Sequence, residues 1–320
     1  MSLPELKIDK LTARLPIIQG GMAVRISTGA LAGAVAATGA IGVIGASGMA
    51  FDELRKEIRI ARERAAGGIV GINIMFAARD FLGIVHTAIK EKIDLIITGA
   101  GFSRDIFKLG RDGATPIVSI VSSARLAQTA EGLGASAIIV EGKEAGGHLG
   151  TDRSVWDIFP EVKKAVSLPV IAAGGIINGA EMCRAFKTMN VDGVQMATRF
   201  VLAEECAAAP EYKKRYQTAT KDDVVIISSP VGMPGRAIKT ALVEKILKKE
   251  APRPVGCDFC LKKCSLQYCI IQALINSQKG DIEHGVVFSG EYVWKIKDRT
   301  IKPAAKIVAE ILEEAKEAGC

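Results

Sequence analysis

Eight short apolar runs recur along the first 200 residues, and each is followed by a stretch with helical periodicity. The runs cover Pro16–Gly20, Ile41–Ala46, Ile69–Met75, Leu95–Gly99, Pro116–Val121, Ala137–Glu141, Pro169–Ala173 and Gly193–Ala197. Strands that are apolar on both faces and alternate with helices are typical of a parallel sheet covered by helices. Eight repeats of this unit predict an α/β chain that closes into a (β/α)8 TIM barrel.

The alternative is an open, doubly wound sheet that binds a dinucleotide. Such a fold requires one glycine-rich turn after its first strand and an acidic residue about 20 residues later. Here glycines follow nearly every strand, and Gly20-Gly21-Met22 does not form that fingerprint. The composition agrees with a barrel, because 49% of the residues are hydrophobic and only 5% are aromatic, which leaves Ala, Val, Ile and Leu to fill the core.

The alternation stops after about residue 205, so we expect a barrel over 1–205 and an extension over 206–320 that packs on it as a mainly helical cap. Helical patterns and one short strand pattern, Val224–Ser228, punctuate this extension, and Gly232–Gly235 is typical of a loop. The expected helices cover Pro210–Thr218, Thr240–Lys249, Ile270–Ser277 and Pro303–Ala318.

The charge pattern bears on partners and location. The net charge is +7, but the basic residues are dispersed, and the dense segment Lys245–Lys249 stands beside acids. Without an aromatic-studded basic stripe we expect no nucleic-acid partner, whereas an anionic cofactor or an acidic carrier protein fits. There is no charged-then-apolar leader and no apolar run of about 18 residues, so we expect a cytoplasmic chain that does not enter a membrane. A homodimer is one of the oligomeric states left open.

The loops after the seventh and eighth strands contain candidate phosphate ligands. The seventh strand runs into Gly174 and Gly175, and the eighth into Ala197 and Thr198. Glycines remove Cβ atoms, so that backbone N–H groups can approach phosphate oxygens, and Thr198 adds a hydroxyl. In TIM barrels phosphate commonly binds after strands seven and eight, which favours this use over a pair of tight turns without a ligand.

A histidine stands in the glycine-rich loop after the sixth strand. His148 lies in the segment Glu141–Gly150, which contains four glycines. Nothing in such a loop packs around an imidazole as a core would, and its ordinary pKa suits proton transfer near neutrality. We therefore expect His148 to be catalytic, the alternative being an exposed loop residue without a role.

The first loop and two strand ends could hold a flat aromatic ligand. Gly21 and Met22 open the barrel mouth with little side-chain bulk and a flexible thioether. Asn73 ends the third strand and Gln195 lies in the eighth, where each could hydrogen-bond a pyrimidine edge. The alternative for each is an ordinary turn or barrel-layer residue.

These segments resemble the nitronate monooxygenase (2-nitropropane dioxygenase) family, which includes the FMN-dependent enoyl-acyl-carrier-protein reductase II. The matching segments are PIIQGGM, GINIM, IIVEGKEAGGHLG, PVIAAGGI and GVQMATRF, in order over about residues 12–240. The resemblance implies noncovalent FMN, with His148 in the place of the active-site histidine. Ala197 departs from the family, where Gly often precedes Thr, but an alanine amide can still donate to phosphate. By the match, the flavin would be lined by Gly21, Met22, Asn73, Gly146, Gly147, Gly174, Gly175, Ala197 and Thr198.

Four cysteines within thirteen residues are the second unusual feature of the extension. Their order is Cys257, Cys260, Cys264 and Cys269. Four soft ligands this close suit zinc or an iron–sulfur cluster, although the spacing matches neither the paired zinc ribbon nor the common ferredoxin pattern. The alternative is four reduced thiols. Seven cysteines with four of them bunched suit a reducing compartment, and Cys183, in a helix, is expected to be a packing residue.

Two reactions fit the same residues. The first, which we place narrowly ahead, is oxidation of alkyl nitronates with O2, with His148 removing a proton from the nitroalkane or positioning the nitronate. The second is reduction of an enoyl thioester, carried by acyl carrier protein or another group, with NAD(P)H as co-substrate. A third hypothesis is a flavin electron-transfer module with a metal cluster, and a barrel that binds a phosphosugar instead of flavin is also open.

Overall fold

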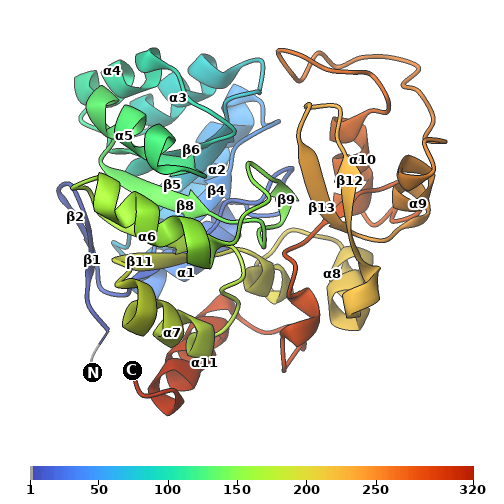
Figure 1. The fold of residues 1–320 in the computed structure, drawn as a ribbon. Coiled ribbons are helices and arrows are strands. Elements are labelled where there is room, and N and C mark those ends of the chain that lie inside the picture. The colour runs from blue at the N-terminus through green and yellow to red at the C-terminus, as the bar shows by residue number, and fades with distance from the viewer. Residues whose placement is uncertain (1–2) are drawn as a thin grey trace.

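The computed structural model describes residues 3–320, and it contains the expected TIM barrel (Figure 1). Its strands follow the order β3-β11-β10-β8-β7-β6-β5-β4, and all neighbouring pairs are parallel. The ring closes where the Gln19 N–H donates to the Ile41 carbonyl and the Ile41 N–H donates to the Ile17 carbonyl, both at 2.9 Å. The strands are β3 (Ile17–Gln19), β4 (Gly42–Gly45), β5 (Val70–Met75), β6 (Leu95–Gly99), β7 (Ile117–Val121), β8 (Ala137–Glu141), β10 (Val170–Ala173) and β11 (Gly193–Met196).

Helices cover the outside of this ring. The one that follows the eighth strand comes from the far end of the chain: α11 (Ala304–Glu317) packs against α1 and α7, and Figure 1 shows it beside α7. The chain therefore leaves the barrel after β11 and returns about a hundred residues later to complete the helical layer. The other outer helices are α1 (Gly29–Ala37), α2 (Phe51–Arg64), α3 (Phe81–Lys90), α4 (Arg104–Asp112), α5 (Ala124–Leu133), α6 (Val155–Ala165) and α7 (Gly179–Met189).

Side chains alternate between the inside of the barrel and the helical layer, as a strand requires. In β8, Ala137 and Ile139 belong to the inner cluster, and Ile138 and Val140 to the cluster under the helices. The hairpin of β1 (Leu6–Ile8) and β2 (Leu11–Ala13) joins the inner cluster. Since this hairpin adds its apolar residues to the barrel interior, only the opposite rim, at the C-terminal strand ends, is left for a site.

From the sequence we expected the extension to be a mainly helical cap with one short strand. It contains a small antiparallel sheet with helices around it. Its strand β13 (Pro234–Ile238) pairs with β12 (Val224–Ser228), with β14 (Val287–Phe288) and with β9 (Gly147–His148) from the barrel. Pro234-Gly235, expected in a loop, therefore begins a strand, because pairing with distant segments decides its conformation. The helices are α8 (Pro210–Thr218), α9 (Ala241–Leu247) and α10 (Ile270–Gln278), with short 3-10 turns at Thr198–Leu202, Lys221–Asp223 and Val293–Lys295.

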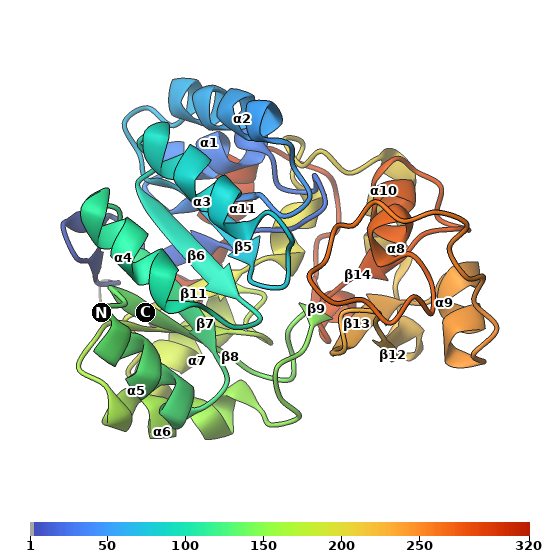
Figure 2. The same cartoon turned by 90° about the horizontal axis from the view of Figure 1, so that it is seen from above.

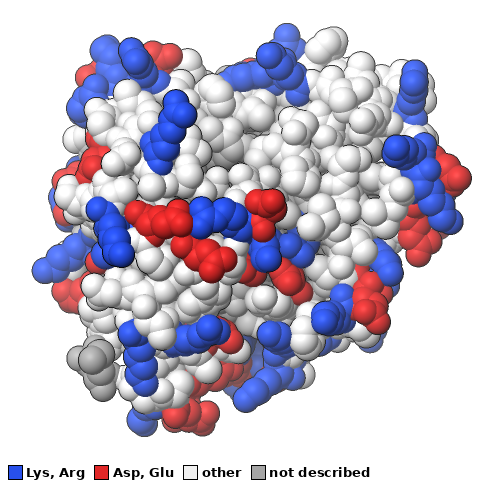
Figure 3. Space-filling model, in the orientation of Figure 1, with Lys and Arg blue, Asp and Glu red and all other residues white. Residues whose placement is uncertain are grey.

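The part of the extension that precedes α11 stands to one side of the barrel, and the C-terminal end of the chain lies on the other side (Figures 1 and 2). Between the barrel and this part of the extension lies β9, a piece of a barrel loop that joins the small sheet (Figure 2). On the face shown in Figure 3, Lys and Arg are interspersed with Asp and Glu. No helix within residues 3–320 is long and apolar enough to cross a membrane.

One cysteine expectation is incomplete, because Cys183 packs in the core as expected but is not a free thiol. Cys183 of α7 does not merely pack but forms a disulfide with Cys320, at a sequence separation of 137 residues. The sequence could not reveal this pair, because the partner sulfur is brought near only when α11 docks on α7. The other five cysteines, those at 206, 257, 260, 264 and 269, are free thiols.

The close packing of α1 on β4 can be tested at Gly42. A Cβ there would lie 1.8 Å from the Ala32 carbonyl oxygen, so we expect Gly42→Ala to lower the free energy of unfolding by about 1–3 kcal/mol. The matched control is Gly132→Ala in α5, where a Cβ meets nothing within 4 Å. That change should raise the free energy of unfolding by about 0.5–1 kcal/mol. Urea unfolding measures both, and equal stability of the two variants would contradict this packing.

Candidate functional site

A cavity of about 280 Å³ lies at the C-terminal strand ends, between the barrel rim and the extension. Every cofactor and catalytic residue expected from the sequence lines this cavity, although these residues belong to six separate loops and strands. That the residues bind a cofactor stays a prediction, but the fold does bring them together. They are Gly21, Met22, Asn73, Gly146, Gly147, His148, Gly174, Gly175, Gln195, Ala197 and Thr198.

Asn73 and Gln195 reach the cavity because both belong to the inward set of their strands. Their sequence neighbours Ile72, Val194 and Met196 pack under the helices instead. The Oε1 atom of Gln195 is buried and has no hydrogen-bond partner among the described residues. A buried acceptor without a partner costs free energy, so a donor from a ligand is expected to satisfy it.

The two loops in which we expect phosphate, Gly174–Gly179 and Ala197–Arg199, both line the cavity, with residues 174–177 and 197–198. Gly174 and Gly175 have φ of +92° and +76°, a conformation that side chains rarely adopt, so the turn between β10 and α7 depends on glycine there. The Thr198 hydroxyl accepts from the Gly290 N–H at 3.1 Å. Backbone amides with one hydroxyl suit phosphate, and the orphaned amide of Gln195 suits the polar edge of a ring. These residues therefore fit FMN.

His148 is held by the extension. Its strand β9 pairs with β13, its Nε2 lies 2.8 Å from the Ser229 hydroxyl, and its ring contacts the Phe288 ring edge-on at 5.1 Å. Burial lowers the pKa of His148 from 6.5 to about 4, because removal from water disfavours the charged form of the ring. The imidazole is therefore neutral at physiological pH, and its unprotonated ring nitrogen can accept a proton or a hydrogen bond.

Buried charges fix the loop that carries His148. Glu144 is 2% exposed and accepts from the Val155 N–H at 3.1 Å, while its own carbonyl accepts from the Glu291 N–H at 3.0 Å. Arg236, also buried, donates to the carbonyls of Ala145 and Lys143 at 3.1 and 2.5 Å. The loop is glycine-rich but not free, since charge-assisted hydrogen bonds hold it from two sides.

Glu141 is a candidate that we did not identify from the sequence. It lines the cavity and continues the inward alternation of Ala137 and Ile139. Burial raises the pKa of its carboxyl to about 7, so that it carries a proton part of the time near neutrality. The signal was present, because an acid that ends an apolar strand of a barrel lies on the rim where chemistry occurs.

The extension supplies further wall residues that no local pattern marks. Ser229 follows β12, 81 positions after His148, and the hydroxyls of Tyr212 and Tyr216 both donate to the Phe288 carbonyl, at 3.4 and 2.5 Å. Their roles depend on pairing between segments far apart in the chain. The extension residues that line the cavity include Tyr212, Tyr216, Val231, Cys260, Leu261, Ile270, Ile271, Leu274, Phe288, Ser289 and Gly290.

The four clustered cysteines do not form a ligand set. Within residues 3–320, no three His, Cys, Asp or Glu side chains are arranged to hold a metal ion. The segment instead contributes Cys260 and Leu261 to the cavity wall and docks on the barrel. Leu261 bridges to Ala78, and the Lys262 ammonium donates to the Phe76 carbonyl at 2.7 Å and lies 3.7 Å from the centre of the Phe76 ring. The structure therefore does not support the expected zinc or iron–sulfur site.

Comparisons with solved structures agree with this architecture. FabK from Thermotoga maritima superimposes with a TM-score of 0.85 at 33% sequence identity, over 95% of this chain and 93% of that chain. Nitroalkane oxidase from Streptomyces ansochromogenes superimposes with a TM-score of 0.79 over 95% and 97% of the two chains. At 20% identity the second likeness shows the fold alone.

Sequence comparisons place the chain in a family. A curated relative from Mycobacterium tuberculosis, named (3aS,4S,5R,7aS)-5-hydroxy-7a-methyl-1-oxo-octahydro-1H-indene-4-carboxyl-CoA dehydrogenase, is 30% identical over 72% of this chain, which matches 65% of that protein's length. A probable nitronate monooxygenase from Staphylococcus aureus is 24% identical over 95% of both chains. The sequence model described as Nitronate monooxygenase matches residues 4–85 and 60–314. The chain therefore belongs to the nitronate monooxygenase family of FMN-dependent oxidoreductases.

Proposed function

We propose that this chain is an FMN-dependent reductase that uses NAD(P)H to saturate the double bond of an enoyl thioester. The observation that carries the proposal is the character of the cavity wall. The sequence alone placed nitronate oxidation first, and the cavity favours the reductase instead.

The part of the wall supplied by the extension contains a group of apolar side chains. Leu261, Ile270, Ile271 and Leu274 line it from the cysteine segment and α10, with Val24 from the barrel. Apolar walls bind a ligand by removing its hydrocarbon from water. An acyl chain uses such a surface, whereas a small nitronate leaves it empty.

The cavity also carries little charge. No Lys or Arg is among the described residues that line it, and the low pKa of His148 keeps that ring neutral above about pH 4. A nitronate is an anion and would find no cationic side chain there. An enoyl thioester is uncharged at its reacting end and needs none.

The protein residues have distinct roles in this reaction. FMN, when bound, supplies the hydride transfer from the nicotinamide to the β-carbon of the substrate. One proton must also reach the α-carbon, so that NAD(P)H and a proton are consumed for each bond saturated. Nε2 of His148 is engaged by Ser229 at 2.8 Å, which fixes the ring. We assign to His148 a hydrogen bond to the thioester carbonyl, and to Glu141 the storage of a proton on the rim.

The relatives add support from another direction. FabK, at 33% identity, and the enoyl reductase domain of MlnA from Bacillus amyloliquefaciens, at a TM-score of 0.77, share the fold. The curated dehydrogenase from Mycobacterium tuberculosis carries a CoA thioester in its name. Nitronate oxidation is the second candidate, because the family match and the Staphylococcus aureus relative bear that name and a neutral His148 could accept a carbon-bound proton.

Anaerobic stopped-flow absorbance separates the two candidates. The flavin-loaded protein is mixed with NADH, NADPH or propyl nitronate, and reduced protein is then mixed with crotonyl-CoA. We expect a nicotinamide to bleach the flavin and the enoyl thioester to restore its colour at catalytic speed. Rapid bleaching by the nitronate, with no reaction of either nicotinamide, would contradict the reductase.

The apolar wall predicts a dependence on chain length. Leu274→Trp adds bulk to the cavity, so we expect kcat/KM for an eight-carbon enoyl thioester to fall about tenfold or more, with a smaller effect on a four-carbon substrate. Leu247→Trp is the control, because that residue is 45% exposed on α9 and does not line the cavity. Equal losses for both chain lengths would contradict an acyl site along α10.

The low pKa of His148 predicts a pH dependence of stability. The folded-state pKa of about 4 lies below the ordinary 6.5, so the neutral ring contributes fully above pH 6.5 and its contribution is lost as the pH falls toward 4. We expect the wild type to lose up to about 3 kcal/mol relative to His148→Gln across this window. Denaturant unfolding at a series of pH values measures the difference. Parallel stability curves would show that the folded protein does not shift this pKa.

A further inference from the structure

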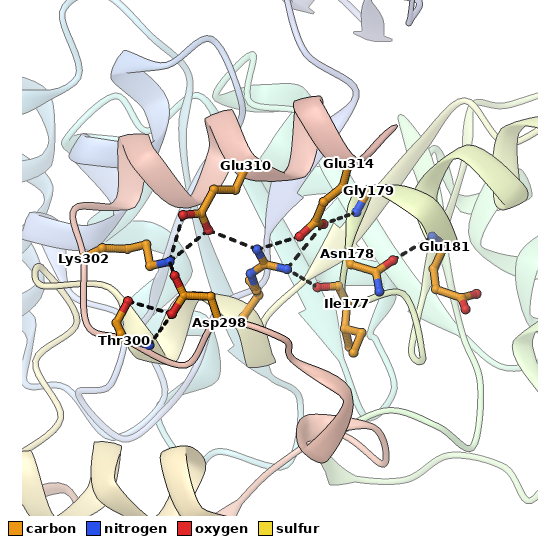
Figure 4. Close-up of polar contacts among 10 residues, drawn as sticks. Ile177, Asn178, Gly179, Glu181, Asp298, Thr300, Lys302, Glu310 and Glu314 are labelled. Atoms are coloured by element: carbon orange, nitrogen blue, oxygen red, sulfur yellow. Dashed lines mark hydrogen bonds and ion pairs between the residues drawn. The ribbon is translucent and has the colours of Figure 1, made fainter. Parts of the chain in front are cut away.

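The last helix of the chain, α11, touches both phosphate loops from behind. Figure 4 shows two side chains projecting from it, Glu314 toward Gly179 and Glu310 toward Lys302. Between them lies Arg199, which directly follows Thr198 and is 4% exposed. The contacts of Arg199 and Glu314 therefore connect the cavity to the far end of the chain.

Glu314 joins the two loops through its two oxygens. Its Oε2 accepts from the Gly179 N–H at 2.8 Å, at the start of α7, and from Arg199 at 3.4 Å (Figure 4). Its Oε1 accepts from Arg199 at 3.0 Å. The same guanidinium donates to the Ile177 carbonyl at 3.4 Å, and Ile177 lines the cavity. One carboxylate thus fixes the loop after β10 and the loop after β11 relative to each other.

The backbone of α11 packs closely against the start of α7. A Cβ on Gly179 would lie 1.9 Å from the Ile311 carbonyl oxygen and 2.3 Å from the Ala315 nitrogen. The helix therefore packs directly on the first residue of α7. A second carboxylate, Glu310, completes the support, because it accepts from Arg199 at 3.2 Å and from Lys302 at 2.8 Å.

We propose that Glu314, acting through Arg199 and Gly179, is a positioning residue for the flavin phosphate. The phosphate contacts come from backbone amides and the Thr198 hydroxyl, and no Lys or Arg among the described residues lines the cavity. Affinity for phosphate then depends on how accurately these neutral donors are held, and a charge-assisted bond fixes them better than a neutral one. The inference rests on FMN as cofactor but not on the identity of the substrate.

The test compares two flavins that differ only in the phosphate. Full-length protein freed of flavin is titrated with FMN and with riboflavin, and quenching of flavin fluorescence gives each dissociation constant. In Glu314→Gln we expect FMN to bind about tenfold more weakly, while riboflavin binds as it does to the wild type. Parallel weakening of both flavins, or of neither, would overturn the proposal, because a general structural role does not distinguish them.

Two further variants keep the result interpretable. Glu313→Gln makes the same change on the exposed side of α11, where Glu313 pairs with Lys316 at 3.9 Å, and should leave both affinities unchanged. If Glu314→Gln does not fold, Glu314→Asp keeps the charge beside Arg199 but shortens its reach to Gly179, and should weaken FMN alone. A wild type that binds neither flavin would refute the cofactor itself, a result distinct from failure of the enoyl-reductase proposal, which stopped-flow tests separately.

Discussion

The closure of the sheet between Ile17, Gln19 and Ile41 places the C-terminal ends of eight parallel strands on one rim, and the cavity depends on that ring. Within each strand, alternation then decides which side chains point inward. Asn73 and Gln195 reach the cavity because their neighbours on either side pack under the helices, and Glu141 does so because it follows Val140, which packs there. The polar residues of the rim are therefore a consequence of backbone geometry, and their chemistry follows from the burial that the extension adds.

The extension changes that chemistry because it removes the rim from water. Without β13 and Phe288, His148 would lie in an open glycine-rich loop, with nothing to lower its pKa. In the folded chain β9 pairs with β13 and the ring contacts Phe288, and burial lowers the pKa of His148 to about 4. Burial raises the pKa of Glu141 to about 7 in the same cavity, so both groups lose charge near neutral pH. An uncharged reacting group is the ligand that such a site accommodates at least cost.

The sequence predicted what depends on local pattern. All eight barrel strands, α8, β12 and the cavity-facing Asn73, Gln195 and His148 could be inferred from periodicity and from glycines at strand ends. Pairing between distant segments could not. The strand at Pro234–Ile238 pairs with β9, Ser229 contacts His148 from 81 positions away, and Cys183 forms a disulfide with Cys320 from 137 positions away. Each of these contacts joins segments that are far apart in the chain. The cysteine spacing predicted a metal, but the spacing alone does not specify how the four thiols are oriented.

The position of the extension in the chain explains why it is connected directly to the loops in which we expect phosphate. The part of the extension that precedes α11 lies between the eighth strand, β11, and the eighth helix, α11, so the chain enters it from Thr198–Leu202 and leaves it into the helix that holds Arg199. Direct bonds reinforce this connection, since Gly290 donates to Thr198 at 3.1 Å and Glu291 donates to Glu144 at 3.0 Å. Glu314 and Arg199 fix the loops expected to hold the flavin phosphate from the side of α11, through the Gly179 N–H and the Ile177 carbonyl. These loops are therefore held by contacts from both ends of the inserted segment, because Gly290 reaches Thr198 from one side and Glu314 reaches Arg199 from the other.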